Sequence, residues 1–114
     1  MRVIISIFAQ QQIRETSKFI YRRFGKKAKD NFMQEVKKTR RLLETNPYLG
    51  PEESLLTNEA LEYRSVVVNH LNKMVYCITE GYIKVADFWD CRRDPKKLVE
   101  QTIAQSDDSK KNDE

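Results

Sequence analysis

The first quarter of the chain changes from a strand pattern to a helix pattern near Ala9. The β-branched, apolar run Val3-Ile4-Ile5-Ser6-Ile7-Phe8 predicts a first strand over about residues 2–8, with a central position in the sheet. After Ala9, positions of one helical face recur every three or four residues, and Gly25 predicts the helix stop. The positions on that face are Ile13, Ser17, Ile20, Tyr21 and Phe24.

A second helix is predicted between Gly25 and Asn46. Its core-facing positions are Ala28, Phe32, Val36, Thr39 and Leu43, with Met33 and Leu42 beside them. Asn46-Pro47 ends the helix, because the residue before a proline is disfavoured in the α region. The joint at Gly25-Lys26 is so short that the two helices are expected to form an antiparallel hairpin.

After Leu61 the hydrophobic period becomes two, which predicts three consecutive strands. The expected strands are residues 63–68, 73–79 and 82–89, joined by a turn at residues 69–72 and a two-residue turn at Glu80-Gly81. Arg92-Arg93-Asp94-Pro95 then predicts the start of a short helix. The apolar face of that helix would be Leu98, Val99, Thr102 and Ile103.

The order of elements therefore predicts an α+β fold, β-α-α-β-β-β(-α), with the helical hairpin packed on one face of an antiparallel-rich sheet. The opposite face of the sheet is expected to be left for solvent or a partner. With 114 residues the chain fits a single domain, assigned to residues 1–104. Residues 105–114 contain no apolar side chain, so they are expected to form a disordered polar tail.

The charge balance points toward an anionic partner. The net charge is +4 and the isoelectric point is about 9.1, which favours nucleic acid, an acidic protein or an anionic membrane surface. No apolar run approaches the ~20 residues that a membrane-spanning helix needs. Cys77 and Cys91 lack metal-ligand spacing and are expected to be free thiols in a reducing cytosol. No metal or cofactor is predicted.

The polar residues restrict the chemistry that the chain can perform. His70 is the only histidine, which excludes a two-histidine acid–base mechanism for RNA cleavage within one subunit. Phosphodiester chemistry would then depend on guanidinium and ammonium groups that stabilise the transition-state charge. In a meander, Lys73 is expected to approach Trp89, Asp90 and Arg92. Arg64 is expected toward the far end of its strand. The candidate site comprises Arg64, Lys73, Arg92 and Arg93, with Trp89, Asp90 and His70 as further candidates for substrate binding.

Each candidate also has an ordinary structural explanation. Trp89 either stacks on a base or belongs to the core. Arg64 and Lys73 fit solvated strand positions, and Arg92-Arg93 fits a salt-bridge corner. The basic excess of the two predicted helices fits either a solvated surface or an electrostatic footprint for a polyanion.

Several segments, in their order and spacing, resemble the RelE/ParE superfamily of bacterial toxins. The likeness extends from about Arg2 to Ile103. The segments that carry it are Val3-Ile4-Ile5-Ser6, the helix end at residues 19–25, residues 43–50, Tyr63-Arg64-Ser65-Val66-Val67-Val68, Lys73-Met74-Val75-Tyr76 and residues 88–95.

The resemblance implies a toxin of a type II toxin–antitoxin system in a bacterial cytoplasm, neutralised by an antitoxin that wraps an extended or helical segment around it. One branch resembles ribosome-dependent mRNA endonucleases, and carried over by position its catalytic groups fall on Arg64, Lys73 and Arg93. Two further catalytic positions of the nuclease branch fall on Val66 and Val99. Valine at these positions departs from the pattern of that branch. The other branch resembles inhibitors of DNA gyrase, which act by binding, and the long helical hairpin is closer to that branch.

An alternative hypothesis, from another functional class, is that the protein is a non-toxic, basic module that binds RNA or associates with the ribosome. The target therefore stays open between gyrase and ribosome-bound mRNA, with the binding mechanism slightly favoured.

Overall fold

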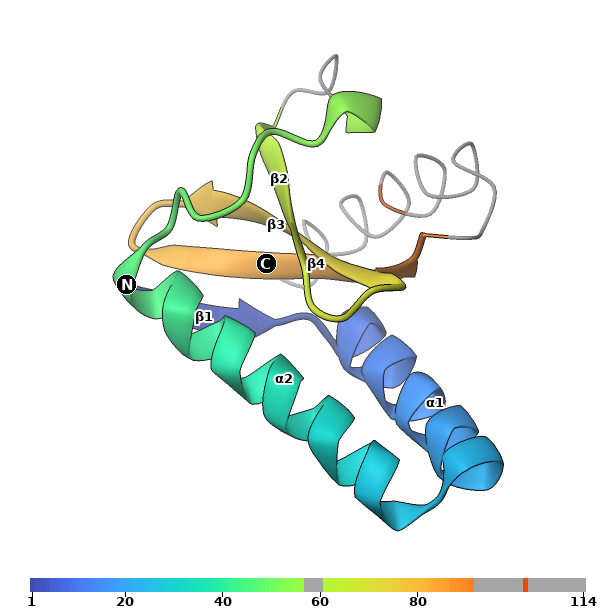
Figure 1. Ribbon diagram of the computed structural model, residues 1–114. Coiled ribbons are helices and arrows are strands. Elements are labelled where there is room, and N and C mark those ends of the chain that lie inside the picture. The colour runs from blue at the N-terminus through green and yellow to red at the C-terminus, as the bar shows by residue number, and fades with distance from the viewer. Residues whose placement is uncertain (57–60, 92–101, 103–114) are drawn as a thin grey trace.

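The structure, a computed structural model, describes residues 1–56, 61–91 and 102. Two long helices pack against a four-stranded sheet (Figure 1). The elements are β1 (Arg2–Ile5), α1 (Ile7–Phe24), α2 (Lys26–Thr45), the short 3₁₀ helix η1 (Ser54–Leu56), β2 (Tyr63–Val67), β3 (Asn72–Thr79) and β4 (Tyr82–Asp90). The strand order is β1-β4-β3-β2, with β1 parallel to β4 and the other pairs antiparallel. The predicted α+β class and helical hairpin are confirmed.

The first strand is shorter than predicted and lies at an edge of the sheet. Ser6 caps α1, because its hydroxyl oxygen accepts a 3.1 Å hydrogen bond from the Ala9 amide. Ile7 and Phe8 therefore belong to the helix, and the prediction of a strand over residues 2–8 was wrong at its carboxyl end. The predicted central position was also wrong. Among the described strands β1 pairs only with β4, and Ile4 on β1 is 39% exposed.

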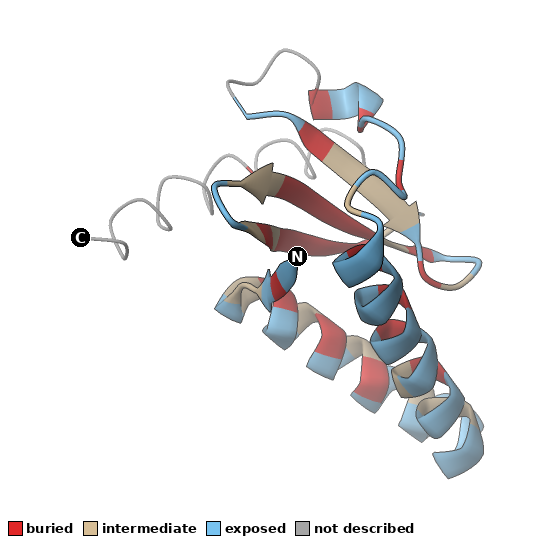
Figure 2. Ribbon diagram, turned by 90° about the vertical axis from the view of Figure 1, so that its left-hand side faces the viewer, coloured by how far each residue is buried: buried red, intermediate tan, exposed pale blue. Residues whose placement is uncertain are grey.

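The helical hairpin forms as predicted around Gly25, whose φ of 91° favours glycine. The inner face of α1 is buried at Ile13 and Ser17, but Tyr21 and Phe24 are exposed by 53% and 68%. Both residues lie toward the turn between α1 and α2, at the end of the hairpin that extends away from the sheet (Figure 1), and the ribbon there is mostly exposed (Figure 2). The α2 helix ends at Thr45, immediately before Asn46-Pro47, as predicted.

The three later strands form the predicted meander. The β3–β4 turn lies at Glu80-Gly81, as predicted, and Gly81 has φ 82°, a left-handed conformation that glycine adopts at little cost. The register shifts within this hairpin: Val75 pairs with Asp87, whereas Tyr76 pairs with Val85. Ala86 is therefore an extra residue in β4 at a β-bulge.

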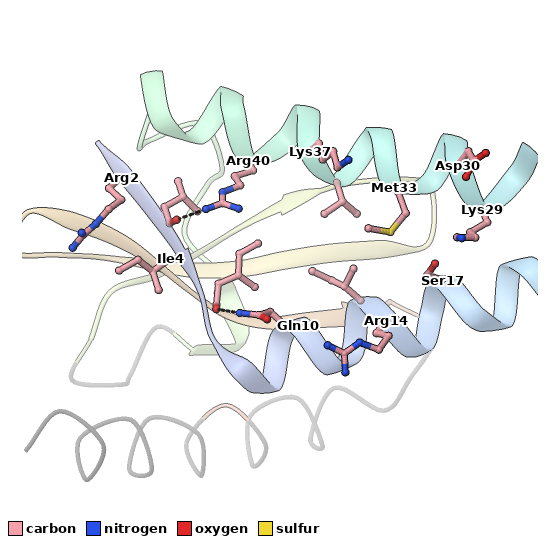
Figure 3. A pocket seen from close by; sticks show the side chains of 14 residues that line it. Arg2, Ile4, Gln10, Arg14, Ser17, Lys29, Asp30, Met33, Lys37 and Arg40 are labelled. Carbon is pink, nitrogen blue, oxygen red and sulfur yellow. Dashed lines mark hydrogen bonds between the residues drawn. The ribbon is translucent and has the colours of Figure 1, made fainter. Parts of the chain in front are cut away.

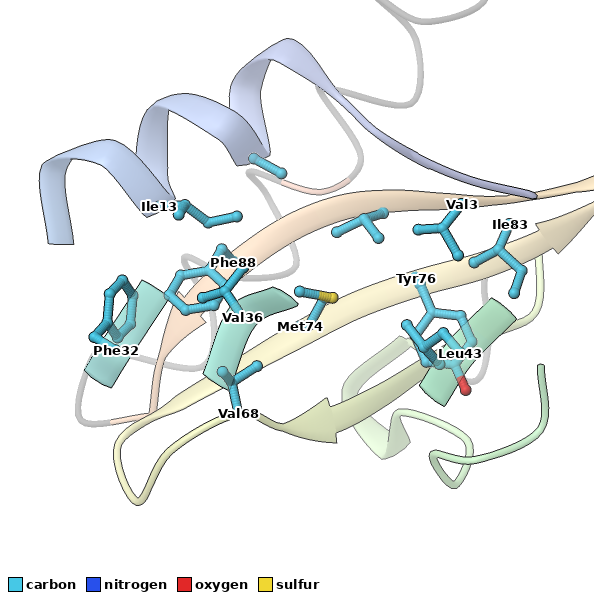
Figure 4. Packing of buried hydrophobic residues seen from close by; sticks show 12 residues of the cluster. Val3, Ile13, Phe32, Val36, Leu43, Val68, Met74, Tyr76, Ile83 and Phe88 are labelled. Atoms are coloured by element: carbon cyan, nitrogen blue, oxygen red, sulfur yellow. The ribbon is translucent and has the colours of Figure 1, made fainter. Parts of the chain in front are cut away.

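The core occupies both faces of the sheet. Between the helices and the sheet lies one cluster that includes Phe32, Val36 and Phe88 (Figure 4). The rings of Phe32 and Phe88 meet edge to face at 5.8 Å between centroids. A second cluster covers the opposite face and consists of Leu56, Tyr63, Val75, Cys77, Ala86 and Trp89. The expectation that this face is left for solvent or a partner was therefore wrong for these residues, because the chain covers it with its own apolar groups.

Several expectations lie outside the described residues. These are Arg92, Arg93 and most of the predicted last helix, of which only Thr102 is described, as a helical and fully buried residue. The proposed tail at residues 105–114, and hence the domain boundary at residue 104, also lie outside them.

Candidate functional site

The strand register separates the two basic residues that the sequence places in a candidate catalytic set. Arg64 pairs with Tyr76, and Lys73 pairs with Val67 on one side and Trp89 on the other. Tyr76 and Lys73 are three residues apart on a regular strand, so their side chains point to opposite faces of the sheet. Arg64 thus shares the helix-facing side with Tyr76, while Lys73 lies on the other side. The two cations of the candidate set therefore do not share one face of the sheet.

Arg64 holds the loop that follows α2. One guanidinium nitrogen donates a 2.9 Å hydrogen bond to the Gly50 carbonyl, and the other donates a 3.0 Å bond to the Glu62 carboxylate. The guanidinium carbon lies 4.8 Å from the centre of the Tyr48 ring. The side chain is only 17% exposed, so it stabilises the loop and presents little charge to solvent.

Tyr76 binds the same loop from the neighbouring strand. Its hydroxyl donates to the Pro47 carbonyl at 2.8 Å and accepts from the Gly50 amide at 3.0 Å. Burial raises the pKa of the Tyr76 phenol, although the Gly50 amide and the Arg64 charge act in the opposite direction, so the hydroxyl stays protonated and able to donate. Gly50 passes so close to β2 that a Cβ atom on it would lie 2.1 Å from the Ser65 carbonyl oxygen.

Lys73 is neutralised by a carboxylate of its own chain. Its ammonium nitrogen donates a 2.6 Å hydrogen bond to Glu53, and the two side chains are exposed by only 16% and 5%. Burial alone would raise the pKa of the Glu53 carboxyl. Hydrogen bonds from Lys73 and Ser65, with the Lys73 charge, outweigh burial and hold that pKa below its ordinary value of 4.5. Lys73 is therefore committed to an internal ion pair.

The remaining candidates differ in accessibility. Trp89 is 2% exposed within the second core cluster, which matches its core interpretation and keeps the indole away from a base in this structure. Asp90 ends β4 beside Asn72, at the same end of the sheet as Lys73, as expected from the meander. His70 is exposed in the β2–β3 turn. Val66, which stands at a position of the nuclease pattern, packs against the core.

A basic groove between the two helices and β1 was not identified from the sequence. It has a volume of about 930 Å³, and its apolar floor includes Ile13, Met33 and Val36 (Figure 3). Five cationic side chains line it, namely Arg2, Arg14, Lys29, Lys37 and Arg40, with Asp30 as the acidic one. The α2 residues that line the groove recur about every four positions, and this spacing already indicated that they share one face of a helix. Only the fold shows that β1 completes the groove.

The unpaired edge of β1 borders this groove. Its outward carbonyls already have side-chain donors, since Arg40 binds the Val3 carbonyl at 3.0 Å and Gln10 binds the Ile5 carbonyl at 2.8 Å (Figure 3). An apolar floor bordered by cations suits an extended or helical polypeptide segment. A smaller hollow of about 340 Å³ adjoins the groove toward the end of the hairpin and shares Ser17 and Lys29 with it.

Other kinds of site find little support among the described residues. Within residues 1–56, 61–91 and 102, no group of three His, Cys, Asp or Glu side chains is placed to hold a metal ion. Burial raises the pKa of the Cys77 thiol, although the Lys84 charge acts in the opposite direction, so this thiol is a weak nucleophile. In the same part of the chain, no helix is long and apolar enough to cross a membrane.

Comparison with known proteins identifies the fold. The chain is similar to the solved structure of the YoeB dimer from Staphylococcus aureus, with a TM-score of 0.52 and 20% sequence identity, over 76% of this chain and 92% of that chain. The fold is YoeB-like. This agrees with the RelE-type architecture expected from the sequence resemblance. No protein-family model matches the sequence, and no curated protein matches it.

Proposed function

We propose that the protein is the toxin component of a type II toxin–antitoxin system and inhibits growth by binding its target without cleaving RNA. Two observations support the toxin assignment together: the YoeB-like fold and the sequence motifs that resemble the RelE/ParE superfamily. The protein would act in the bacterial cytoplasm, and its activity would be held in check by a cognate antitoxin.

The positions of Arg64 and Lys73 are the main argument for a binding mechanism and against RNA cleavage. A phosphoryl transition state needs its cationic groups to converge on one phosphate. Here the two side chains point to opposite faces of the sheet, and each is engaged by carbonyl or carboxylate groups of the chain. The alternative, ribosome-dependent mRNA cleavage by Arg64, Lys73 and Arg93, would require both the loop of Gly50 and the Glu53 segment to release these groups.

DNA gyrase is the target that we propose for the binding mechanism, with ribosome-bound mRNA as the alternative. The proposal is tested with the purified chain in two parallel assays. Inhibition of gyrase supercoiling without cuts in ribosome-bound mRNA is the expected result. Cuts detected by primer extension would contradict the binding mechanism. Normal growth on induced expression, with neither effect in vitro, would favour the non-toxic RNA-binding module.

The basic groove is the proposed docking site for the antitoxin. Its apolar floor and five cations fit an amphipathic segment with acidic side chains, and the exposed β1 edge lies beside it. Lys37 lines the groove, whereas Lys38 is exposed on the outer side of α2 and lines neither hollow. We therefore expect Lys37→Glu to weaken neutralisation by the antitoxin, and the matched control Lys38→Glu to leave it nearly unchanged. Equal effects of the two variants would place the antitoxin elsewhere.

A further inference from the structure

The positive charge of the molecule is concentrated on the helical hairpin. Residues 7–45 contain 11 basic and 4 acidic side chains, whereas the whole chain has 21 and 17, so the remainder has a net charge of −3. Within the hairpin, residues 16–30 contain six basic side chains and one acidic side chain. These residues surround the turn between α1 and α2, at the end of the molecule away from the sheet (Figure 1). The hairpin end is therefore strongly cationic.

Aromatic rings are exposed among these charges. Phe19, Tyr21 and Phe24 are exposed by 45%, 53% and 68%. Two cations already lie over rings: the Arg23 guanidinium is 5.7 Å from the Phe19 ring centre, and the Lys29 ammonium is 5.8 Å from the Tyr21 ring centre. Exposed aromatic faces next to cations are the combination that binds unpaired bases together with their phosphates.

A shallow hollow brings cationic side chains and an aromatic ring together. It measures about 340 Å³ and is lined by Ser17, Lys18, Tyr21, Arg22 and Lys29. Lys18 and Arg22 are one helical turn apart on the same face of α1, and both line this hollow together with Tyr21. We propose that this end of the hairpin binds single-stranded RNA, with one unpaired base against Tyr21 and the flanking phosphates on Lys18 and Arg22.

Single-stranded RNA fits this surface better than a DNA duplex or an anionic lipid surface does. A DNA duplex presents phosphates but keeps its bases stacked inside, so the exposed rings would gain nothing from it. Folded RNA offers unpaired bases in loops and bulges, which proteins bind by stacking. An anionic lipid surface shares the negative charge but offers no bases to stack. The proposal goes beyond the toxin assignment, since it concerns an anchoring surface remote from Arg64 and Lys73.

The test measures fluorescence anisotropy of a labelled, unstructured RNA of about 12 nucleotides with the purified chain. Tyr21→Ala is expected to weaken binding roughly tenfold, as loss of one stacked base does, while Tyr21→Phe keeps the ring and the affinity. Lys18→Gln is expected to weaken binding and to reduce the slope of log K against log salt by about 0.7. Lys38→Gln removes the same charge from the outer side of α2 and is expected to change binding less.

Several results would overturn the proposal. These are equal losses in Lys18→Gln and Lys38→Gln, unchanged binding in Tyr21→Ala, or tighter binding to single-stranded DNA, duplex DNA or anionic phosphatidylglycerol vesicles than to RNA. Circular dichroism is the control for folding, and each variant is expected to fold because Tyr21 and Lys18 are exposed. The binding assay does not depend on toxicity, so a chain that binds RNA without inhibiting growth would refute the proposed function and leave this inference intact.

Discussion

The ion pair between Lys73 and Glu53 offers a direct test of whether Lys73 is structural. The Lys73→Met substitution keeps most of the side-chain volume but removes the ammonium group 2.6 Å from the Glu53 carboxylate. Glu53 is 5% exposed and would keep only weaker donors, including the Leu55 amide at 3.4 Å. An unpaired carboxylate would thus remain in a largely buried site.

The expected cost follows from that burial. Removing one partner of a buried ion pair destabilises a protein by about 3–5 kcal/mol. Lys73 is 16% exposed, so water partly reaches the remaining charge, and we expect the lower end, about 3 kcal/mol. At roughly 4 °C per kcal/mol for a domain of this size, the melting temperature should fall by about 12 °C.

Urea and thermal denaturation measure this loss, followed by circular dichroism and by the fluorescence of the single tryptophan, Trp89, which pairs with Lys73 in the sheet. Combining Lys73→Met with Glu53→Gln should recover part of the loss, because the buried carboxylate is then neutral, with a coupling free energy of about 2 kcal/mol. Lys84→Met is the matched control, since Lys84 is another half-buried strand lysine and has no ion pair with the described residues.

The same pair predicts a pH dependence. The pKa of Glu53 is lower in the folded protein than its ordinary value of 4.5, so the ionised carboxylate contributes stability above that pH. This contribution is lost as the pH falls through the folded-state pKa, and the loss should be smaller in Glu53→Gln. If Lys73→Met lowers the melting temperature no more than Lys84→Met does, the structural role is refuted and Lys73 becomes available for catalysis.

Two further substitutions, at Gly50 and Tyr76, test the loop that Arg64 binds, and a third, at Gly81, is their control. Gly50→Ala should destabilise the protein by about 3 kcal/mol, because the new Cβ would lie 2.1 Å from the Ser65 carbonyl oxygen. Gly81→Ala meets no atom within 4 Å and should cost only about 1 kcal/mol through its φ of 82°. Tyr76→Phe removes a hydroxyl that donates to Pro47 and accepts from Gly50, and should cost about 2 kcal/mol. Urea denaturation measures all three, and a Gly50→Ala protein as stable as Gly81→Ala would refute the close approach.

The sequence was sufficient to predict the turns and helix ends that depend on neighbouring residues alone. The turn at Gly25, the helix end before Asn46-Pro47 and the hairpin turn at Glu80-Gly81 each depend on the backbone preferences of two or three neighbouring residues. The resemblance to RelE/ParE toxins added the correct fold, because the order and spacing of several segments describe a whole architecture. Ser6 shows the limit of the pattern, since one capping hydroxyl ended an apolar run that otherwise continued as strand.

The functional surfaces depended on contacts between residues distant in the chain. Lys73 is paired with a carboxylate 20 positions earlier, and Arg64 binds a carbonyl 14 positions earlier. The register of β2 and β3 placed these two cations on opposite faces, which no local preference specifies.

The sequence by itself therefore determined the helical hairpin, the meander of β2, β3 and β4, the turns and the excess of positive charge, because each follows from composition or from near neighbours. The tertiary structure alone decided that β1 lies at an edge, that its edge borders a basic groove, and that the hairpin end carries exposed aromatic rings among its cations. The physical reason is that burial and pairing of a side chain are set by elements packed against it, and those elements come from remote parts of the chain.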